Sequence, residues 1–537
     1  MSDLCWSGIT VKIDGTRFIT NMTSLQNSFT ILYSHKLKVL LVLMMLTVAT
    51  ILRLYNLPNT LIFQADQARD ALIVSKIFTE GKPVFIGPVT SVGNMYLGPL
   101  YYYFMLPFLA LSYPSPLGPA YGIAFLSIVT IFLFYYVGTK LLGSPAGLIS
   151  ATMASCSTVL IYFSRFSWNP NPVPFVSLLM VYLTYMAWKK DSTYWIGVAI
   201  CFGVLLQLHY ITLIMFAGAC FFWLLSLHSL IKMKDRNSFK NEFISFLKIT
   251  GISVFVLVIS FSPLILFDAR HDWVNLKAFQ SIFTSEKILS NSSEFKFKDL
   301  LFGIFRESHG RTIEVLFTLF FGKVTQIQNY LLCLILGYLF YFATCRNKIP
   351  HWNGQFVVLI YLLLSIAGIS AYKRSIFDHY LLFIIPMSLL FWGSVFTNFY
   401  TYLLGKVGLI LFLFIFFWYN LSHLPLTSQG WTIYRVKNVT DEILTQLHPG
   451  EKYDVVLLSE SGDFYALNYR YFLNASTVPP IRYDFYEPVS TLVIINENRK
   501  NKSSDMIPVY QIQVFGKPNE IKKTVHEDGP NIEIWRK

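Results

Sequence analysis

Long apolar stretches recur along this chain from residue 37 to residue 421. A helix of about 20 apolar residues spans the hydrocarbon core of a bilayer, which is roughly 30 Å thick. Scanning on that basis predicts about eleven membrane-spanning helices. They lie near residues 37–54, 119–139, 146–164, 173–188, 194–209, 211–230, 247–267, 328–344, 354–371, 379–396 and 404–421.

One more apolar run, at residues 97–111, does not fit this series. It is short for a span and contains two prolines. Counting it as a span would also move Lys189 and Lys190 to the outer side, against the preference of basic residues for cytoplasmic loops. Its tyrosines suit the headgroup region. We therefore predict an interfacial helix that lies along the outer membrane surface.

Basic residues between the apolar stretches set the predicted orientation. Lys and Arg in short loops stay on the cytoplasmic side. Six basic positions or clusters fall on one side with this helix count, namely Lys36 with Lys38, Lys140, Lys189 with Lys190, the run 232–236, Arg346 with Lys348, and Lys406. The chain is thus predicted to be a multi-pass protein of the plasma or inner membrane. Its predicted parts are a polar cytoplasmic tail at 1–35, a transmembrane domain at 36–421, and outer loops at 55–118 and 268–327.

Composition supports a membrane protein and excludes other classes. The chain is 54% hydrophobic, 17% aromatic and only 14% charged, which is far from the profile of a soluble domain. A formal charge of +13 could suggest a nucleic-acid partner, but many basic residues cluster at the ends of apolar stretches, so we predict none. Four of the six cysteines lie in apolar stretches, so no disulfide framework is predicted. Translation could start at Met1 or at Met22.

The composition changes after the last apolar stretch. Apolar runs at 453–458, 491–495 and 509–515 predict strands, and 434–447 and 463–473 predict helices. The segment 422–537 is thus predicted to be an extracytoplasmic, water-soluble α/β domain. It contains neither a nucleotide-binding glycine loop nor a metal-spacing cysteine pair. We therefore expect a lid or docking module rather than independent catalysis.

The first outer loop contains the best candidate for chemistry. Asp66, Arg69 and Asp70 follow the first span at helical spacing. Asp66 and Asp70 share a helix face at i and i+4, while Arg69 can orient a carboxylate. A carboxylate poised in this way can take a proton from a hydroxyl. A salt-bridged surface helix is the alternative reading of the same pattern.

A second cluster of polar residues lies at the outer end of the third span. Arg165, Trp168, Asn169 and Asn171 are part of a short loop with two Asn-Pro steps. These side chains could offer hydrogen bonds and an aromatic wall to a sugar, or they could only form an interhelical turn. His209 ends a later span, where it could face the same cavity or pack at the interface.

Several outer loops also contain basic residues that such loops usually lack. Arg270 follows a span on the outside, and Lys373, Arg374 and His379 belong to one short outer loop. Arg and Lys bind phosphate through charge-assisted hydrogen bonds. A phosphate-headed lipid at the outer leaflet would explain these charges, and incidental contact with membrane lipids is the alternative.

These motifs together resemble the GT-C superfamily of membrane glycosyltransferases, in the branch related to protein O-mannosyltransferases and the lipid A aminoarabinose transferase. The resemblance covers about residues 35–425. It rests on the acidic motif around Asp66, the Gly98–Tyr102 juxtamembrane run, which includes Tyr101, and the motif after Ser164. It implies a GT-C fold, a polyprenyl-phosphate sugar as donor, and Asp66 as the base that deprotonates the acceptor.

The chain departs from the family pattern at two positions. Gln67 occupies a place where the family often has glutamate, and Asn169 or Asn171 stands where it often has aspartate. A hard cation such as Mg²⁺ or Mn²⁺ would lose ligands at such a site. We therefore expect an activity that needs no metal and no other cofactor.

The predicted reaction moves a sugar from the lipid donor to a hydroxyl of a lipid, glycan or protein on the outer face. Lys373 and Arg374, with Arg270, would stabilise the leaving phosphate, and a single displacement would invert the anomeric configuration. A lipid-linked sugar flippase and a non-catalytic polysaccharide assembly protein are the rival readings. Transporters often show internal repeats or charges in mid-span, and neither is visible in this chain.

Overall fold

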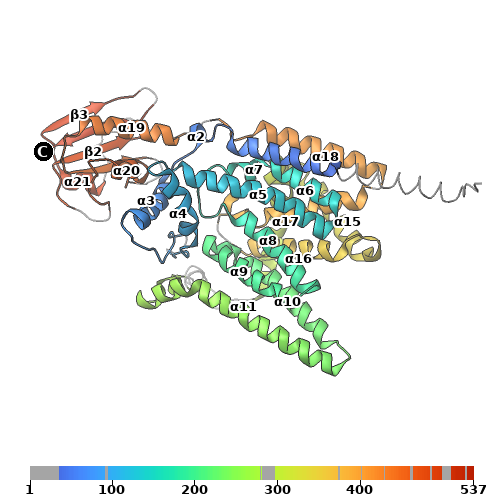
Figure 1. The fold of residues 1–537 in the computed structure, drawn as a ribbon. Coiled ribbons are helices and arrows are strands. Elements are labelled where there is room, and N and C mark those ends of the chain that lie inside the picture. The colour runs from blue at the N-terminus through green and yellow to red at the C-terminus, as the bar shows by residue number, and fades with distance from the viewer. Residues whose placement is uncertain are drawn as a thin grey trace, which may run out of the picture.

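The computed structural model describes most of the chain. The described residues are 36–90, 95–278, 280, 297–372, 375–400, 402–427, 430–459, 464–483, 487–498, 509–526 and 529–537. Helices form a bundle, and a small sheet lies at one end of it, beside α2, α3 and α4 (Figure 1). We call this end of the bundle the sheet end.

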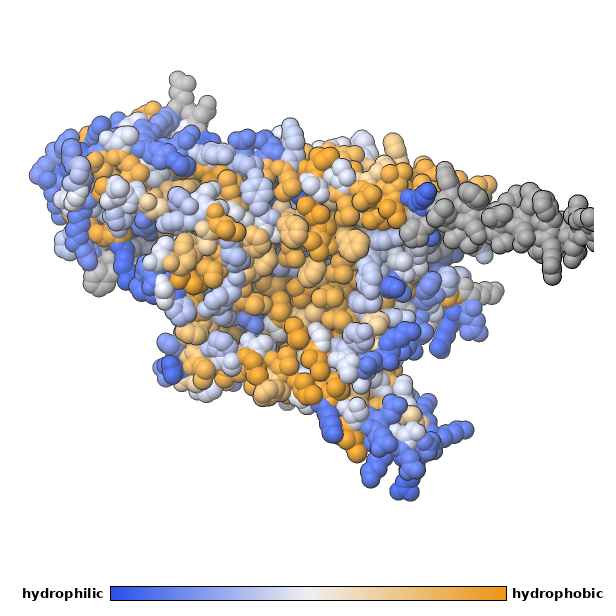
Figure 2. Space-filling model, in the orientation of Figure 1, coloured by the Kyte–Doolittle hydropathy of each residue, from blue (hydrophilic) through white to orange (hydrophobic). Residues whose placement is uncertain are grey.

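Every predicted span coincides with a helix. The helices are Lys36–Leu54, α5 Leu117–Leu142, α6 Ser144–Cys156 with α7 Thr158–Tyr162, α8 Val173–Lys189, α9 Tyr194–Leu208, α10 Met215–Ile231 after the turn Tyr210–Ile214, α11 Arg236–Arg270, α15 Gln328–Thr344, α16 Trp352–Ser370, α17 Ile385–Phe399 and α18 Leu403–Ser422. Among the described residues, six helices are long and apolar enough to cross a membrane, and α4, α8, α9 and α15 are shorter apolar helices. An apolar belt covers the bundle between hydrophilic ends (Figure 2).

Two predicted spans differ in detail from the structure. The third is interrupted at Ser157, whose backbone is extended, and the amide of Thr158 donates to the side chain of Asn420 instead. The tenth starts with a short 3-10 turn, Asp378–Leu381, and its helix α17 begins only at Ile385. Hydropathy cannot detect such breaks because they do not interrupt the run of apolar residues.

Further helices lie outside the predicted spans. At the sheet end are α2 Leu57–Thr60, α3 Ala65–Thr79 and α4 Leu100–Ser112, the last being the predicted interfacial helix. Residues 297–321 form α13 Phe297–Ile313, a π turn Glu314–Thr318 and α14 Leu319–Phe321. This stretch packs into the bundle, since Trp392 donates to the carbonyl of Leu316 at 3.0 Å and the ring of Phe321 lies 5.0 Å from that of Phe412.

The C-terminal domain is a mixed four-stranded sheet with helices on both faces. Its elements are α19 Ile433–Gln446, β1 Tyr453–Leu458, α20 Leu467–Asn474, β2 Thr491–Asn496, α21 Tyr510–Phe515, β3 Glu520–Thr524 and β4 Asn531–Arg536. The strand order is β1-β2-β4-β3, with β1 and β2 parallel and the other pairs antiparallel. Helices α19 and α20 cover one face, and α21 covers the other.

The predicted strand at 509–515 is wrong, because most of this segment is the helix α21. Val509, Ile512 and Phe515 are buried at intervals of three, which is a helical spacing. They pack beside Trp535 of β4. Strands β3 and β4 had not been predicted. The four central residues of β4 are buried, whereas most of β3 is an exposed edge rich in lysine.

Candidate active site

Helix α3 begins at the sheet end, directly after the chain leaves α2. The side chain of Gln67 accepts a hydrogen bond from the amide of Gln64 at 2.9 Å, which satisfies a donor at the helix start. Asp66 lies in the first turn, where the positive end of the helix dipole favours a carboxylate. The helix therefore presents a stabilised negative charge at its exposed end.

Arg69 connects the two acidic residues of this helix. Its guanidinium donates to Asp66 at 2.8 Å and to Asp70 at 2.8 and 3.0 Å. The Asp66 side chain is 50% exposed, whereas that of Asp70 is 1% exposed. Asp66 is thus the accessible carboxylate of the pair, and Asp70 holds the arginine that orients it.

Asp70 lies in an apolar setting that changes its protonation. Burial raises its pKa to about 6, although Arg69 acts in the opposite direction. The hydroxyl of Tyr102 donates to one carboxylate oxygen at 3.2 Å, while the other oxygen has no hydrogen-bond partner among the described residues. Tyr102 lies on α4, so this contact ties α3 to the juxtamembrane helix.

Rings from three distant parts of the chain gather near Asp66. The ring of His379 lies 4.6 Å from that of Trp168, 5.7 Å from that of His209 and 4.5 Å from that of Tyr380. The charge of Asp66 acts on the imidazole of His379, so the carboxylate is within electrostatic reach of this ring.

Arg165 has structural partners. Its guanidinium donates to the carbonyls of Leu52 at 3.0 Å and Tyr55 at 2.9 Å, and to the hydroxyl of Thr60 at 2.6 Å. These groups surround the end of the first helix, whose last carbonyls lack partners within the helix. Arg165 is buried, and these hydrogen bonds fix the chain that leads into α3, although the residue also lines a small cavity beside Tyr162 and Pro425.

Three other predicted site residues also form hydrogen bonds inside the fold, although the buried Oδ1 of Asn171 has no partner among the described residues. The hydroxyl of Tyr101 lies 2.6 Å from that of Ser167 and is fully buried. The amide of Asn169 donates to the carbonyl of Leu208 at 2.7 Å, and that of Asn171 donates to the carbonyl of Phe166 at 2.6 Å. The Asn-Pro loop is therefore a rigid brace, from which only Trp168 reaches the ring cluster.

The predicted cationic residues are placed only in part. Arg270 is exposed at the end of α11 and makes no ion pair with a residue that the structure describes. Lys373 and Arg374 lie outside the described residues. Within the described part of the chain, no three His, Cys, Asp or Glu side chains gather in a way that could hold a metal ion.

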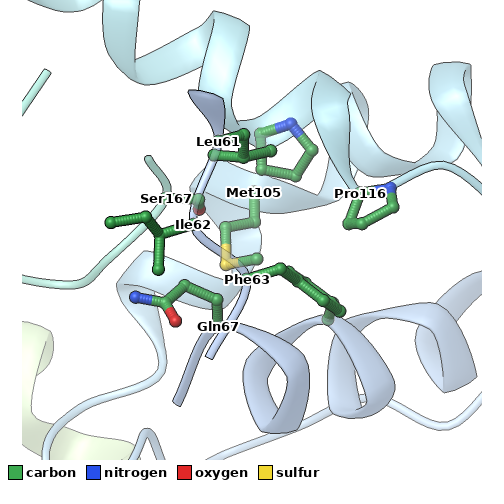
Figure 3. Close-up of a pocket in the computed structure, with 9 residues that line it drawn as sticks. Leu61, Ile62, Phe63, Gln67, Met105, Pro116 and Ser167 are labelled. Atoms are coloured by element: carbon green, nitrogen blue, oxygen red, sulfur yellow. The ribbon is translucent and has the colours of Figure 1, made fainter. Parts of the chain in front are cut away.

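A small cavity lies beside the first turn of α3. Its wall is mostly apolar, and side chains from α3, from α4 and from residues 61–63 before α3 line it (Figure 3). The lining residues are Leu61, Ile62, Phe63, Gln67, Ala71, Met105, Pro116, Pro119 and Ser167. Asp66 is not among the residues that line this cavity.

Sequence reasoning missed some of the residues that build this centre. Tyr102 and Tyr380 directly follow two predicted site residues, Tyr101 and His379. Their own contacts could not be predicted, because contacts between side chains far apart in the sequence produce no local sequence pattern. Arg53 is a clearer omission, since it is a charge within the first apolar stretch. It is fully buried and donates to the hydroxyl of Ser127 and to main-chain carbonyls, including that of Ser155.

Comparisons with known proteins concern the sequence and the fold. Residues 97–261 match the family model described as dolichyl-phosphate-mannose-protein mannosyltransferase. No curated protein sequence matches the chain. ArnT from Cupriavidus metallidurans, solved with bound undecaprenyl phosphate, shares the fold with a TM-score of 0.52 and 12% identity, over 92% of this chain and 97% of ArnT.

Two further solved structures are more distant. The same ArnT in its apo state gives a TM-score of 0.49 at 10% identity, over 94% of this chain and 98% of ArnT. The archaeal oligosaccharyltransferase AglB from Archaeoglobus fulgidus, in complex with an inhibitory peptide and a dolichol-phosphate, gives 0.48 at 13% identity, over 86% of this chain and 70% of AglB.

The family match covers the helices α4 to α10 with the loops between them, and part of α11. The shared fold extends over nearly the whole chain, including its apolar helices. Residues 97–261, about a third of the chain, thus match this mannosyltransferase family model, and the chain as a whole shares its fold with ArnT.

Proposed function

We propose that the chain transfers a sugar from a polyprenyl-monophosphate donor to a hydroxyl of a lipid, glycan or protein, at the sheet end of the bundle and on the extracytoplasmic face. The observation that carries this proposal is the geometry of Asp66. It is a half-exposed carboxylate, oriented by Arg69, within electrostatic reach of a cluster of aromatic and imidazole rings.

The proposed step is a direct displacement at the anomeric carbon. Asp66 takes the proton of the acceptor hydroxyl, whose oxygen forms the new glycosidic bond. The bond between the anomeric carbon and the phosphate oxygen breaks, and the electron pair leaves with the polyprenyl phosphate. Attack from the face opposite the leaving group inverts the anomeric configuration. Asp66 later returns the proton to water.

The rings beside Asp66 suit a sugar. Trp168 is half-buried and presents a flat apolar face, and the imidazole of His379 beside it has ring nitrogens that can form hydrogen bonds. Apolar faces and a few convergent polar groups are what small-molecule sites generally use. We assign Trp168, His209 and His379 to sugar binding on this ground.

The donor phosphate needs cations, and the sequence supplies them close to the rings. Arg374 stands five positions before His379 along the chain, and Lys373 precedes it. We assign both to the phosphate, with Arg270 as a further candidate. In that role, Arg374→Ala raises the Kd of undecaprenyl phosphate at least tenfold, and Arg306→Ala, at an exposed arginine of α13, leaves it unchanged. An unaltered Kd in Arg374→Ala would move the phosphate site elsewhere.

The test of the function is product formation. The purified chain is incubated with undecaprenyl-phosphate-linked mannose, glucose, galactose and arabinose, with a crude lipid and glycan fraction as the source of acceptors. An enzyme releases free undecaprenyl phosphate from at least one donor and labels an acceptor. A flippase moves the donor across the membrane of a vesicle without releasing undecaprenyl phosphate, and a non-catalytic assembly protein does neither.

The same assay tests metal dependence. Activity that persists in EDTA supports the expected independence from metal, and loss of activity in EDTA with rescue by Mg²⁺ or Mn²⁺ contradicts it.

A further inference from the structure

The C-terminal domain is joined to the segment that leads into α3. The amide of Ile433 donates to the carbonyl of Leu61 at 2.9 Å, and the amide of Phe63 donates to the carbonyl of Trp431 at 3.4 Å. Ile62 and Thr432 form an antiparallel bridge between these hydrogen bonds. The acidic helix α3 begins at Ala65, two residues after Phe63, and Gln64 is its cap.

Side chains strengthen this junction. The ring of Phe63 lies 5.5 Å from that of Tyr471 and 5.8 Å from that of Phe472, both on α20. The Tyr471 contact is edge to face at 70°, an arrangement that aromatic pairs favour. Phe63 and Tyr471 are each only 2% exposed. We call these three rings the aromatic clamp.

Helix α20 has two buried faces, which is unusual for a helix on a small sheet. Tyr469 and Leu473 pack into the core of the C-terminal domain. Leu467 and Tyr471 instead belong to the apolar core of the helical bundle. One helix thus contributes to two cores, and the contact between the domains buries both Leu467 and Tyr471. A loosely attached lid would not bury large rings in this way.

Phe63 immediately precedes the cap of α3. A hydrophobic residue at that place commonly packs against the fourth residue of its own helix and sets the angle at which the chain enters. Here its ring packs instead against another domain. The orientation of the first turn of α3, and with it Asp66, therefore depends on α20.

From these contacts we propose that the C-terminal domain positions the catalytic carboxylate through the aromatic clamp. Phe63, Tyr471 and Phe472 are positioning residues, since they do not touch the reacting atoms. The inference rests on the proposed function of Asp66. A displacement of about 1 Å at a reacting group can cost on the order of a hundredfold in rate. Loosening the clamp should therefore lower kcat and leave the donor KM nearly unchanged.

The experiment compares Phe472→Ala with Phe472→Tyr and with Phe515→Ala in the full-length chain. Phe472 is only partly buried, so Phe472→Tyr keeps the ring without crowding. Phe515 is a buried aromatic residue of the same domain that packs beside Trp535 on the opposite face of the sheet. Phe515→Ala therefore perturbs the domain without touching the clamp.

Two measurements are made on each purified variant. Hydrogen-deuterium exchange reports local opening of residues 64–70 and needs no substrate. Release of undecaprenyl phosphate, from whichever sugar of the donor panel is active, gives kcat and KM. We expect Phe472→Ala to speed exchange in 64–70 and to lower kcat at least tenfold, with KM within twofold. Phe472→Tyr and Phe515→Ala should match the wild type in both.

Contrary outcomes separate this inference from the function on which it rests. Unchanged exchange in Phe472→Ala overturns the clamp, and so does faster exchange with an unchanged kcat. A loss of kcat in Phe515→Ala as large as in Phe472→Ala also overturns it, because general destabilisation of the domain would then explain both. Full activity of Asp66→Asn instead removes the proposed base, whatever the clamp variants show.

Discussion

Asp66 and Asp70 share one arginine, yet one carboxylate is half exposed and the other is buried. Arg69 donates to both at 2.8 Å. The buried partner has a raised pKa of about 6. Pairs of carboxylates whose surroundings differ in this way commonly have separate roles in catalysis. Here the division is between an exposed group that can meet substrate and a buried group that holds the arginine.

Replacing Asp66 by asparagine should abolish transfer while preserving the fold. Asparagine keeps the size of the side chain but cannot accept the proton, so we expect kcat to fall roughly 10²- to 10⁴-fold. Glu80→Gln is the control, since Glu80 is an exposed carboxylate at the other end of the same helix. Size-exclusion profiles and kcat are measured for both variants. Wild-type kcat in a folded Asp66→Asn protein would contradict the assignment.

Asp70 should make stability depend on pH. Its pKa rises from 3.8 to about 6 on folding, so the folded state binds the proton more tightly. The resulting stabilisation is complete below about pH 4 and is lost as the pH rises through about 6. The change amounts to roughly 3 kcal/mol. Melting temperatures of the wild type and Asp70→Asn, measured from pH 4 to pH 8, should diverge over this window. Parallel curves would show that Asp70 does not titrate there.

Trp168 should affect sugar binding more than chemistry. Its ring lies 4.6 Å from that of His379 in the ring cluster. Aromatic contacts of this kind contribute about 1 kcal/mol beyond area burial, so Trp168→Ala should raise the donor KM roughly fivefold or more. Trp168→Phe, which keeps a flat ring, should stay within about twofold of the wild type, because most of the stacking contact remains. A fall in kcat with an unchanged KM would place Trp168 outside the sugar site.

Arg165 should matter for stability and not for the donor. Its guanidinium satisfies carbonyls at the end of the first helix, and the compact ammonium group of lysine cannot reach every position that the five-donor guanidinium fork reaches. Arg165→Lys leaves buried acceptors unpaired, at a cost of about 1–3 kcal/mol. The melting temperature should fall, while Arg306→Lys at an exposed arginine should not change it. A raised donor KM at unchanged stability would restore Arg165 to the substrate site.

The sequence predicted the spans well because bilayer thickness imposes a length that hydropathy can detect. The ion pairs of Arg69 with Asp66 and Asp70 could also be predicted, since neighbours on a helix surface follow from spacing alone. The clustering of Trp168, His209 and His379 had been expected only from the sidedness of their loops. Their actual contacts depend on how three helices end, which no local pattern specifies.

Arg165 shows why the remaining site assignments were harder. The sequence around a lone arginine in a polar loop does not show whether its guanidinium binds a ligand or main-chain carbonyls, because every residue has such a carbonyl. The strand prediction for residues 509–515 was wrong for a related reason. Alternation and a spacing of three coexist in it, and only packing against Trp535 selects the helix.

During synthesis, Phe63 is made well before Tyr471, the residue that it contacts. Roughly 400 residues separate them, and a ribosome that adds about 5–20 residues per second needs about 20–80 s for that stretch. The acidic helix thus leaves the ribosome soon after the first helix of the bundle, but α20 emerges only after the last. The junction therefore cannot form until α20 has been synthesised, long after α3 has left the ribosome.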